Sequence, residues 1–314
     1  MGTLYLDRKD IDIRCEGRHL CLYEAGSRSA TIPLNVVERV VIRGQATLST
    51  GVLGLLAEEG VGLLVLSGRQ GRNAAILHGK KHGDTARRIA QYRWHHDGEY
   101  RLPWARRLVA LKLKAQARLL RSALQLRPDC RKPLSDGIAR LQRALSSLDD
   151  ASGLERLQGI EGAAAAAYFA GFTQVFPASL GFTGRNRRPP KDPVNAALSL
   201  AYTLLHFEAV HACHAAGLDP YVGFYHEPAY YRESLAADLI EPLRPKADRW
   251  VWRLFAERIL RADSFATEAD RCLLKKNGRE IFYARHESFV RPLRGVLRRY
   301  CLLIARRLTE EAAP

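Results

Sequence analysis

Apolar and polar positions are distributed differently in the first quarter of the chain and in the remainder. Residues 1 to about 80 contain short runs that alternate apolar with polar residues, such as IDIRC and RHLCLYE, separated by Gly, Ser and Asn. Alternation of this kind is typical of half-buried strands. One stretch, LSTGVLGLLAEEG, has helical spacing instead, with Ser49 or Thr50 as a candidate N-cap and Gly60 as a candidate C-cap. We therefore predict a mostly β first part that contains one helix.

From about residue 85 onward, helical spacing dominates. The stretch ARRLVALKLKAQARLLRSALQL places apolar and basic residues on different faces, and NAALSLAYTLLHFEAVHACHAAG ends at Gly217, a candidate C-cap. A chain of 314 residues also exceeds the size at which a single hydrophobic core usually stops growing. The predicted fold class is therefore α+β with two domains: a small β-rich N-terminal domain over residues 1–84 and a larger all-α domain over residues 85–314.

The net charge of the chain indicates which class of partner it binds. Lys and Arg total 49 against 33 Asp and Glu, which gives a net charge of +16 and a sequence pI near 9.9. The excess lies in the second domain, since residues 1–85 hold 11 basic and 9 acidic groups and the rest of the chain holds 38 and 24. A strongly basic domain attracts polyanions such as nucleic acid or an anionic membrane. We expect the second domain to meet the polyanion.

The cysteines and the apolar runs argue against several classes of protein. The six cysteines are scattered, without a Cys-x-x-Cys pair or a spacing that suggests a zinc site or a disulfide framework, which favours a reducing compartment. The segment MGTLYLDRKDIDIRC has no apolar core typical of a signal peptide, and no run approaches the length of a membrane span. We expect a soluble cytoplasmic protein that does not bind a membrane.

A carboxylate inside an apolar helix is the first candidate for chemistry. Glu161 lies among Ala, Ile and Phe in the predicted helix between Leu157 and Phe172. A charge in such surroundings is unfavourable unless it is paired or binds a cation. Glu161 is therefore either the partner of a nearby Arg or a ligand for a metal ion.

The second candidate is the segment GLDPYVGFYHEPAYYRESLAADLIEPLRP. His226 ends an extended run there, and Pro228 prevents a regular helix immediately after it. A short helix can then begin near Ser234, on which Asp238 and Glu241, three residues apart, share one flank. Such acids are often only solvated. Together with Glu161 and His226, however, they make an oxygen-rich set without thiolates, which suits Mg²⁺ or Mn²⁺ and hence phosphodiester chemistry.

Other histidines and tyrosines have less specific patterns. The histidines of HFEAVHACH lack the i, i+4 spacing of a helical metal pair and are interpreted as surface or packing residues; they are His206, His211 and His214. Three tyrosines could in principle be covalent nucleophiles, but their setting favours packing or base stacking. They are Tyr225, Tyr230 and Tyr231.

A basic cluster lies within the predicted Pro- and Gly-rich loop between Phe172 and Asp192. Its members are Arg185, Arg187, Arg188 and Lys191. Guanidinium groups on a compact loop suit phosphate contacts, although an ordinary solvated loop has the same composition. We expect these residues to contact DNA.

Three blocks of the sequence resemble a known family. They are IEGAAAAAYF (160–169), GRNRRPPKDPVNAALSLAYTLL (184–205) and GLDPYVGFYHEPAYYRESLAADLIEPLRP (217–245). In their order, their separation and their position after a β-rich domain, they resemble the CRISPR-associated adaptation integrase/endonuclease, the larger of the two universal spacer-acquisition proteins. The resemblance covers essentially the whole chain.

The resemblance implies both a site and a reaction. Glu161, His226 and Asp238 would be the catalytic metal ligands for Mg²⁺ or Mn²⁺, with Glu241 as an accessory acid. The protein would form a homodimer through its β-rich domains and work with a small ferredoxin-like partner protein on double-stranded or branched DNA. The 3′-hydroxyl of a short DNA fragment would attack a phosphodiester at the repeat of a CRISPR array. The alternative is a DNA-binding scaffold without catalytic activity, in which the acids only stabilise the fold.

Overall fold

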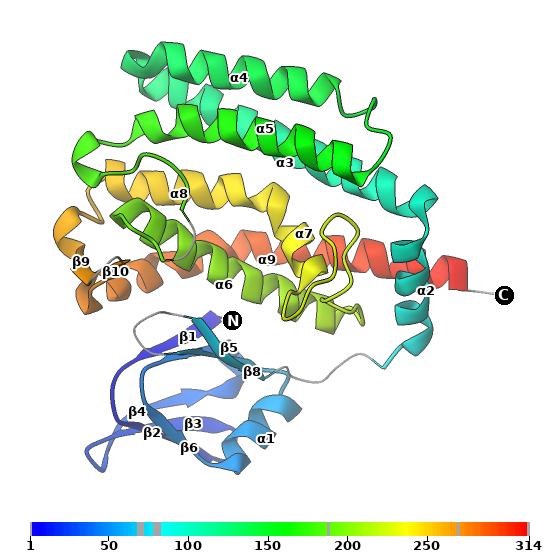
Figure 1. Ribbon diagram of the computed structural model, residues 1–314. Helices are drawn as coiled ribbons and strands as arrows, with labels where there is room; N and C mark the ends of the chain where they lie inside the picture. The colour runs from blue at the N-terminus through cyan, green and yellow to red at the C-terminus, as the bar shows by residue number, and fades with distance from the viewer. Residues whose placement is uncertain (1, 68–71, 78–82, 187–188, 269–270, 313–314) are drawn as a thin grey trace. The chain divides into compact units, whose positions relative to one another are not determined.

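The structure of the chain is a computed structural model. It describes residues 2–67, 72–77, 83–186, 189–268 and 271–312. A strand-rich N-terminal region is followed by a largely helical one, which confirms the predicted fold class (Figure 1). The chain divides into two compact units. The first consists of Met1–Gly83 with Arg279–Pro292, and the second of Asp84–Gly278 with Leu293–Pro314.

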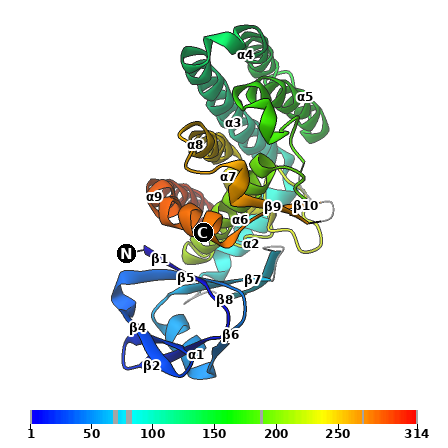
Figure 2. The same cartoon turned by 90° about the vertical axis from the view of Figure 1, so that its left-hand side faces the viewer.

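In the described part of residues 2–77, the first unit contains two four-stranded sheets and helix α1 around an apolar core. One sheet has the strand order β1-β5-β7-β8 and the other β4-β3-β2-β6, and Figure 2 shows them as two layers. The elements are β1 (Gly2–Asp7), β2 (Ile11–Glu16), β3 (His19–Glu24), β4 (Ser27–Pro33), β5 (Val37–Arg43), β6 (Ala46–Leu48), α1 (Thr50–Glu58), β7 (Gly62–Ser67) and β8 (Arg72–Leu77). Ser49 is the N-cap of α1 as predicted, and Gly60 has the left-handed φ of 70° that ends such a helix.

The alternation in the sequence corresponds to the two faces of each strand. In β2, Ile11 and Ile13 are buried in the core, while Asp12 and Arg14 point outward and form an ion pair of 2.7 Å. The central strand β5 pairs in parallel with both β1 and β7 and has an almost continuous apolar run, Val40–Ile42, because both of its faces are covered.

Part of the last helix, α9 (Lys276–Ala312), belongs to the first unit. The Tyr283 ring stacks on the Tyr5 ring at a centroid distance of 4.5 Å, and the Tyr5 hydroxyl shares a hydrogen bond of 2.6 Å with His286 Nδ1. Arg279 adds an ion pair of 2.5 Å with Asp7. A segment from near the end of the sequence therefore completes the packing of β1.

The second unit is built from helices. They are α2 (Thr85–His96), α3 (Gly98–Leu126), α4 (Arg131–Ser146), α5 (Leu154–Phe172), α6 (Pro193–Ala215), α7 (Ser234–Ile240), α8 (Arg244–Ala256) and the end of α9. Helices α3, α4 and α5 pack side by side, and α6 packs against α7 and α8 (Figures 1 and 2). A two-stranded antiparallel hairpin, β9 (Phe265–Glu268) and β10 (Arg271–Leu274), is added to this otherwise helical unit.

Small residues allow α3, α4 and α5 to approach closely. A Cβ atom added at Gly171 of α5 would lie 3.0 Å from the Pro133 carbonyl oxygen of α4. One added at Gly137 of α4 would lie 2.9 Å from Leu120 of α3 and 3.2 Å from the Ala167 carbonyl oxygen of α5. This close packing fixes the position of α5, which carries Glu161. In the described part of the chain, no helix is long and apolar enough to cross a membrane.

We predict that Gly171→Ala lowers the free energy of unfolding by about 1–3 kcal/mol, because the new methyl group overpacks the α4–α5 contact. Gly159→Ala in the same helix is the matched control, since its added Cβ has nothing within 4 Å. The control should stabilise the protein by up to about 1 kcal/mol through helix propensity. Urea unfolding followed by circular dichroism measures both, and equal effects would contradict the packing argument.

Candidate functional site

A lysine ammonium lies between two carboxylates in the second unit. Lys112 Nζ of α3 is 2.5 Å from Glu161 Oε1 of α5 and 2.5 Å from Glu241 Oε2, in the single 3-10 turn Glu241–Leu243 that follows α7. All three side chains are largely buried. Burial alone would lower the pKa of Lys112, but the charges of Glu241 and Glu161 raise it above its usual value. The two carboxylates therefore share one cation.

Glu241 has a second cationic partner. Its Oε1 atom forms an ion pair of 2.9 Å with Arg244 Nε. Burial raises the pKa of Glu241, but the positive charges of Arg244 and Lys112 outweigh burial and lower it to about 2. Glu241 is thus an ionised carboxylate in a buried position, held by charges on two different helices.

Asp238 has different surroundings, although it lies on the same short segment. Its Oδ2 atom accepts hydrogen bonds from the backbone N–H groups of Phe224 and Tyr225 at 2.7 and 2.9 Å. Its Oδ1 atom accepts one from the His226 N–H at 3.0 Å and contacts His226 Nδ1 at 2.7 Å. The residue is only 1% exposed. Gly223 is required beside it, because an added Cβ would lie 2.6 Å from Asp238 Oδ2. Asp238 therefore orients the loop and the imidazole of His226.

The hydrogen bond to Nδ1 determines what His226 can do. A carboxylate that accepts from Nδ1–H fixes the tautomer, so that Nε2 becomes the basic nitrogen. The Tyr225 hydroxyl lies 3.5 Å from Glu161 Oε2. Burial and, next, the charge of Glu161 raise the pKa of Tyr225. The two halves of the site are thus neighbours.

The predicted ligand set is not gathered into one group. His226 and Asp238 are together, and Glu161 and Glu241 are together through Lys112, but among the described residues no three His, Cys, Asp or Glu side chains converge as a metal cluster does. The alternative prediction was an arginine partner for Glu161, and the structure places Lys112 in that position instead. The pattern of the sequence contained a signal for this lysine, because it lies on the same face of α3 as the buried Val109 and Gln116.

The residues that were expected to contact DNA differ in their positions and contacts. Arg185 turns back onto α6: its Nη1 atom donates to Asn195 Oδ1 at 2.6 Å and its guanidinium lies 5.2 Å from the Tyr202 ring centroid. Lys191 is exposed. Arg187 and Arg188 lie outside the residues that the structure describes.

A buried polar network supports the site from behind. Asp248 of α8 accepts hydrogen bonds from the hydroxyls of Tyr168 and Tyr202, and the Arg244 guanidinium lies 4.7 Å from the Tyr202 ring centroid. Burial raises the pKa of Asp248 to about 6, although the two tyrosine hydrogen bonds and the nearby arginines oppose the shift. The network joins α5, α6 and α8 to the residue that pairs with Glu241.

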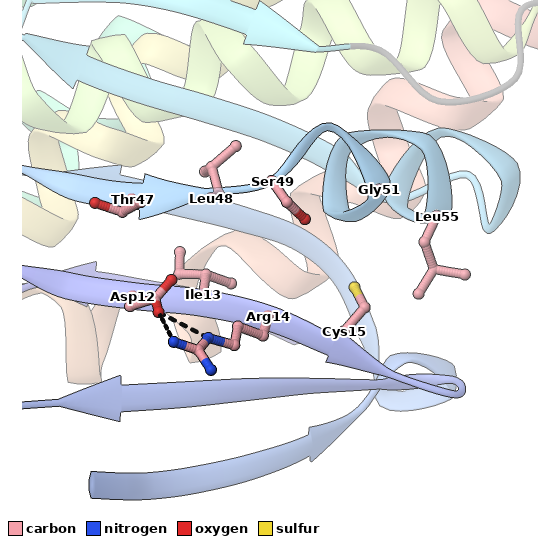
Figure 3. Close-up of a pocket in the computed structure, with 9 residues that line it drawn as sticks. All are labelled: Asp12, Ile13, Arg14, Cys15, Thr47, Leu48, Ser49, Gly51 and Leu55. Carbon is pink, nitrogen blue, oxygen red and sulfur yellow. Dashed lines mark hydrogen bonds and ion pairs between the residues drawn. The ribbon is translucent and has the colours of Figure 1, made fainter. Parts of the chain in front are cut away.

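The first unit has a hollow of about 560 Å³ between β2, β6 and the start of α1 (Figure 3). Its lining residues are Asp12, Ile13, Arg14, Cys15, Thr47, Leu48, Ser49, Gly51 and Leu55. The Asp12 and Arg14 side chains face each other there and form the ion pair already described. None of the predicted metal or DNA residues lines this hollow, so the candidate site is the cluster around Lys112.

Comparison with known proteins gives consistent matches. Residues 4–288 match the family described as "CRISPR associated protein Cas1". The chain is 38% identical to "CRISPR-associated endonuclease Cas1 1" of Thermodesulfovibrio yellowstonii, over 99% of this chain and 98% of the relative. It is 36% identical to "CRISPR-associated endonuclease Cas1 3" of Thermus thermophilus, over 84% and 77%.

Solved structures have the same fold. A Cas1 protein from Thermotoga maritima aligns with a TM-score of 0.86 at 22% identity, over 98% of this chain and 97% of that one. A casposase bound to its integration product aligns with a TM-score of 0.87 at 23% identity, over 100% and 92%. A chain of a Cas6-RT-Cas1–Cas2 complex aligns with a TM-score of 0.83 at 21% identity, over 99% of this chain and 35% of that one.

We predict that Asp248→Asn gains stability relative to the wild type as the pH rises from about 4 to 6. The folded protein holds the Asp248 proton more tightly than the unfolded chain does, so ionisation in this window costs stability only in the wild type. The difference should grow by at most about 3 kcal/mol, at about 1.4 kcal/mol per pKa unit. Urea unfolding at a series of pH values measures it, and a difference that is constant with pH would contradict the prediction.

Proposed function

The chain belongs to the Cas1 family of CRISPR-associated endonucleases, and from this premise we propose that it is a divalent-metal-dependent DNA endonuclease and integrase of CRISPR adaptation. It would insert short DNA fragments into a CRISPR array by attack of a 3′-hydroxyl on a phosphodiester of the repeat. The observation that carries the proposal is the convergence of Glu161 and Glu241 on one cation beside an aspartate-held His226.

The residues around Lys112 fit a divalent ion. Two carboxylates already hold a positive charge between them, so the Lys112 ammonium acts as a stand-in for the ion. Carboxylate oxygens with one imidazole suit Mg²⁺ or Mn²⁺. The hydrogen bond that His226 Nδ1–H donates to Asp238 Oδ1 is the arrangement that commonly orients a metal-bound histidine. We propose that Glu161, Glu241 and His226 Nε2 would hold the metal.

In this proposed ligand set Asp238 is not a metal ligand, whereas the resemblance implies that it is one. What supports the change is that both Asp238 oxygens are occupied by three backbone N–H groups and the imidazole, and that the residue is buried. Ligation by Asp238 would require breaking bonds that hold the loop. Glu241 instead shares a cation with Glu161. We therefore propose that Glu241 is a ligand and Asp238 a positioning residue.

Each side chain around the proposed metal site would have a separate role in the reaction. A bound divalent ion would supply charge to stabilise the phosphate and would help to deprotonate the attacking hydroxyl or water. Tyr225 donates its hydroxyl hydrogen to Glu161 and restrains that carboxylate. Asp238 holds the imidazole of His226 in one tautomer. The Lys112 ammonium, once released from the carboxylates, becomes available to a phosphate oxygen. Cleavage and joining would use the same groups, differing in whether water or a DNA hydroxyl attacks.

We propose double-stranded or branched DNA as the substrate. The large excess of basic groups in the second part of the chain supports this choice. Lys191 is exposed and suited to a phosphate contact. Arg187 and Arg188, which lie outside the described residues, suit the same role by the chemistry of the guanidinium group alone. Arg185 would contribute mainly by holding this loop on α6.

The proposed assembly is a homodimer formed through the β-rich unit, working with a small ferredoxin-like partner in the cytoplasm. The Cas6-RT-Cas1–Cas2 complex contains a chain of this fold, which supports a partner of that kind. The six free thiols agree with a reducing compartment.

We predict that the purified protein joins a labelled short duplex to a supercoiled plasmid that carries a CRISPR repeat, in Mn²⁺ or Mg²⁺ but not in EDTA. Glu161→Gln and Glu241→Gln should each abolish joining, because each removes a charged oxygen ligand. Lys191→Gln should weaken joining by less than tenfold, which separates loss of a phosphate contact from loss of the site. Intact DNA binding without joining in any condition, with the partner protein added, would favour the scaffold alternative.

We further predict that Lys112→Met tightens Mn²⁺ binding about tenfold or more, because the metal would no longer compete with the ammonium for two carboxylates. Lys114→Met, an exposed lysine on the same helix, is the matched control and should leave the Kd unchanged. Glu241→Gln should weaken binding strongly. Isothermal titration with Mn²⁺ measures all three without DNA. Unchanged affinity in Lys112→Met would contradict a shared site for ammonium and metal.

A further inference from the structure

Helix α2 buries two polar side chains on one face. Gln91 is fully buried and His95 is 7% exposed, and their separation of four residues places them side by side on the helix. A buried polar group is costly unless it has hydrogen-bond partners. Both side chains have partners in the loop that runs from Asp219 to His226. Neither residue belongs to the proposed metal site, so this pairing calls for another explanation.

The Gln91 amide holds the start of the loop. Its Nε2 atom donates to the carbonyl oxygens of Asp219 and Val222 at 2.8 and 2.7 Å, and its Oε1 atom accepts from the Asp219 N–H at 2.9 Å. The Tyr92 hydroxyl adds a hydrogen bond of 2.7 Å to Asp219 Oδ2. The loop is neither helix nor strand, so its backbone groups need partners outside regular secondary structure. One side chain supplies three of them.

His95 holds the peptide group between Gly223 and Phe224. Its Nδ1 atom lies 2.7 Å from the Gly223 carbonyl oxygen, and because a carbonyl can only accept, Nδ1 carries the hydrogen. The N–H of the same peptide group, that of Phe224, donates to Asp238 Oδ2. The peptide plane is therefore restrained at both of its polar ends, by a side chain of α2 at one and by a side chain of α7 at the other. A glycine needs this restraint, because its backbone has the most conformational freedom.

The carbonyl groups and the N–H groups of the loop have different partners. The carbonyls are bonded by α2 and by Arg101 of α3, whose Nε atom donates to the Phe224 carbonyl oxygen at 3.1 Å. The last three N–H groups of the loop all donate to Asp238. Asp238 also accepts from the His226 imidazole. A shift of the carbonyls would therefore displace the N–H groups and the imidazole together.

Apolar packing joins α2 to the same loop. The Phe224 ring is 4% exposed and lies 6.0 Å from Trp94 of α2 and 5.9 Å from Trp104 of α3, measured between ring centroids. Trp94 also stacks on Tyr100 at 5.2 Å. These rings keep the helix close to the loop, so that its polar side chains reach the main chain.

Resting on the function proposed above, we propose that Gln91 and His95 are positioning residues, which fix the loop Asp219–His226 and thereby set the position of His226 Nε2 in the metal site. Neither side chain would touch the metal or the DNA. Without the His95 hydrogen bond, the Gly223 carbonyl loses its buried partner and the peptide plane is free to rotate. Asp238 would then accept from displaced N–H groups, and the imidazole would lose its single orientation.

The first measurement is hydrogen–deuterium exchange, followed by mass spectrometry, on the full-length protein in EDTA without DNA. In His95→Leu, the N–H groups of Phe224, Tyr225 and His226 should exchange about tenfold faster or more, and tenfold corresponds to about 1.4 kcal/mol. His95 bonds a carbonyl and none of these N–H groups, so the change reports movement of the loop. Gln91→Met should have the same effect and extend it to the Asp219 N–H. Peptides from α5 should exchange as in the wild type.

Two further variants separate positioning from folding. His95→Asn keeps an N–H donor near the place of Nδ1 and should restore slow exchange in the loop. His96→Leu changes the exposed neighbouring histidine of the same helix and should exchange as the wild type does.

The second measurement is the Kd for Mn²⁺, by isothermal titration without DNA. Removal of a group that orients a metal ligand commonly weakens metal binding about 10- to 100-fold, which is the range expected for Asp238→Asn. His95 acts one step further away, so His95→Leu should weaken binding by about tenfold, at the lower end of this range. His95→Asn and His96→Leu should bind as the wild type does.

Several results would overturn the proposal. They are unchanged exchange of the loop in His95→Leu, exchange that rises equally throughout the second unit, or a His95→Asn variant that behaves like the leucine variant. In a wild type that binds Mn²⁺, an unchanged Kd in His95→Leu would overturn it as well. Failure of the proposed function is distinguishable, because the exchange measurement needs neither metal nor DNA. Faster local exchange that His95→Asn reverses, in a protein that binds no Mn²⁺, would support the restraint of the loop by α2 and contradict the metal site.

Discussion

The second unit depends on one electrostatic constraint: two carboxylates can be buried side by side only when a cation lies between them. Lys112 supplies that cation, and its two ion pairs connect α3, α5 and the turn after α7. Arg244 extends the same charge balance to α8 and, through Tyr202, to Asp248. The close α3–α4–α5 packing around Gly137 and Gly171 keeps Glu161 in reach of this arrangement. The close packing of α3, α4 and α5 and the ion pairs of Lys112 therefore favour the same position of Glu161.

In the function that we propose, the arrangement that stabilises the chain without a metal would also prepare it for one. An exchange of the Lys112 ammonium for a divalent ion would leave the carboxylates where they are, so little reorganisation is needed on binding. Asp238 does not share the Lys112 cation. It accepts hydrogen bonds from backbone N–H groups and so fixes the loop that carries His226.

The sequence predicted the fold better than the roles of individual acids. The period of apolar residues separated the strand-rich region from the helical one, and Ser49, the N-cap of α1, was one of two candidates together with Thr50. The hairpin at Phe265–Leu274 was missed because its strands have four residues each. The resemblance implied that Asp238 is a ligand and Glu241 an accessory acid. The spacing of the two acids alone does not distinguish them, since their surroundings depend on the change from α-helix to a 3-10 turn at Glu241. Lys112 was overlooked because a single lysine on a basic helix is usually solvated, and only tertiary contacts reveal its partners.

The division of α9 between the two units affects how the protein can be cut and recombined. The first unit needs Tyr283 and His286 against Tyr5, and these residues are encoded far from the strands that they cover. A fragment that stops at Gly83 would lack them. A chimera of two family members joined once near that residue would pair β1 from one parent with helix residues from the other. Exchange of an intact first unit requires crossovers on both sides of residues 279–292, so the two segments are expected to be inherited together.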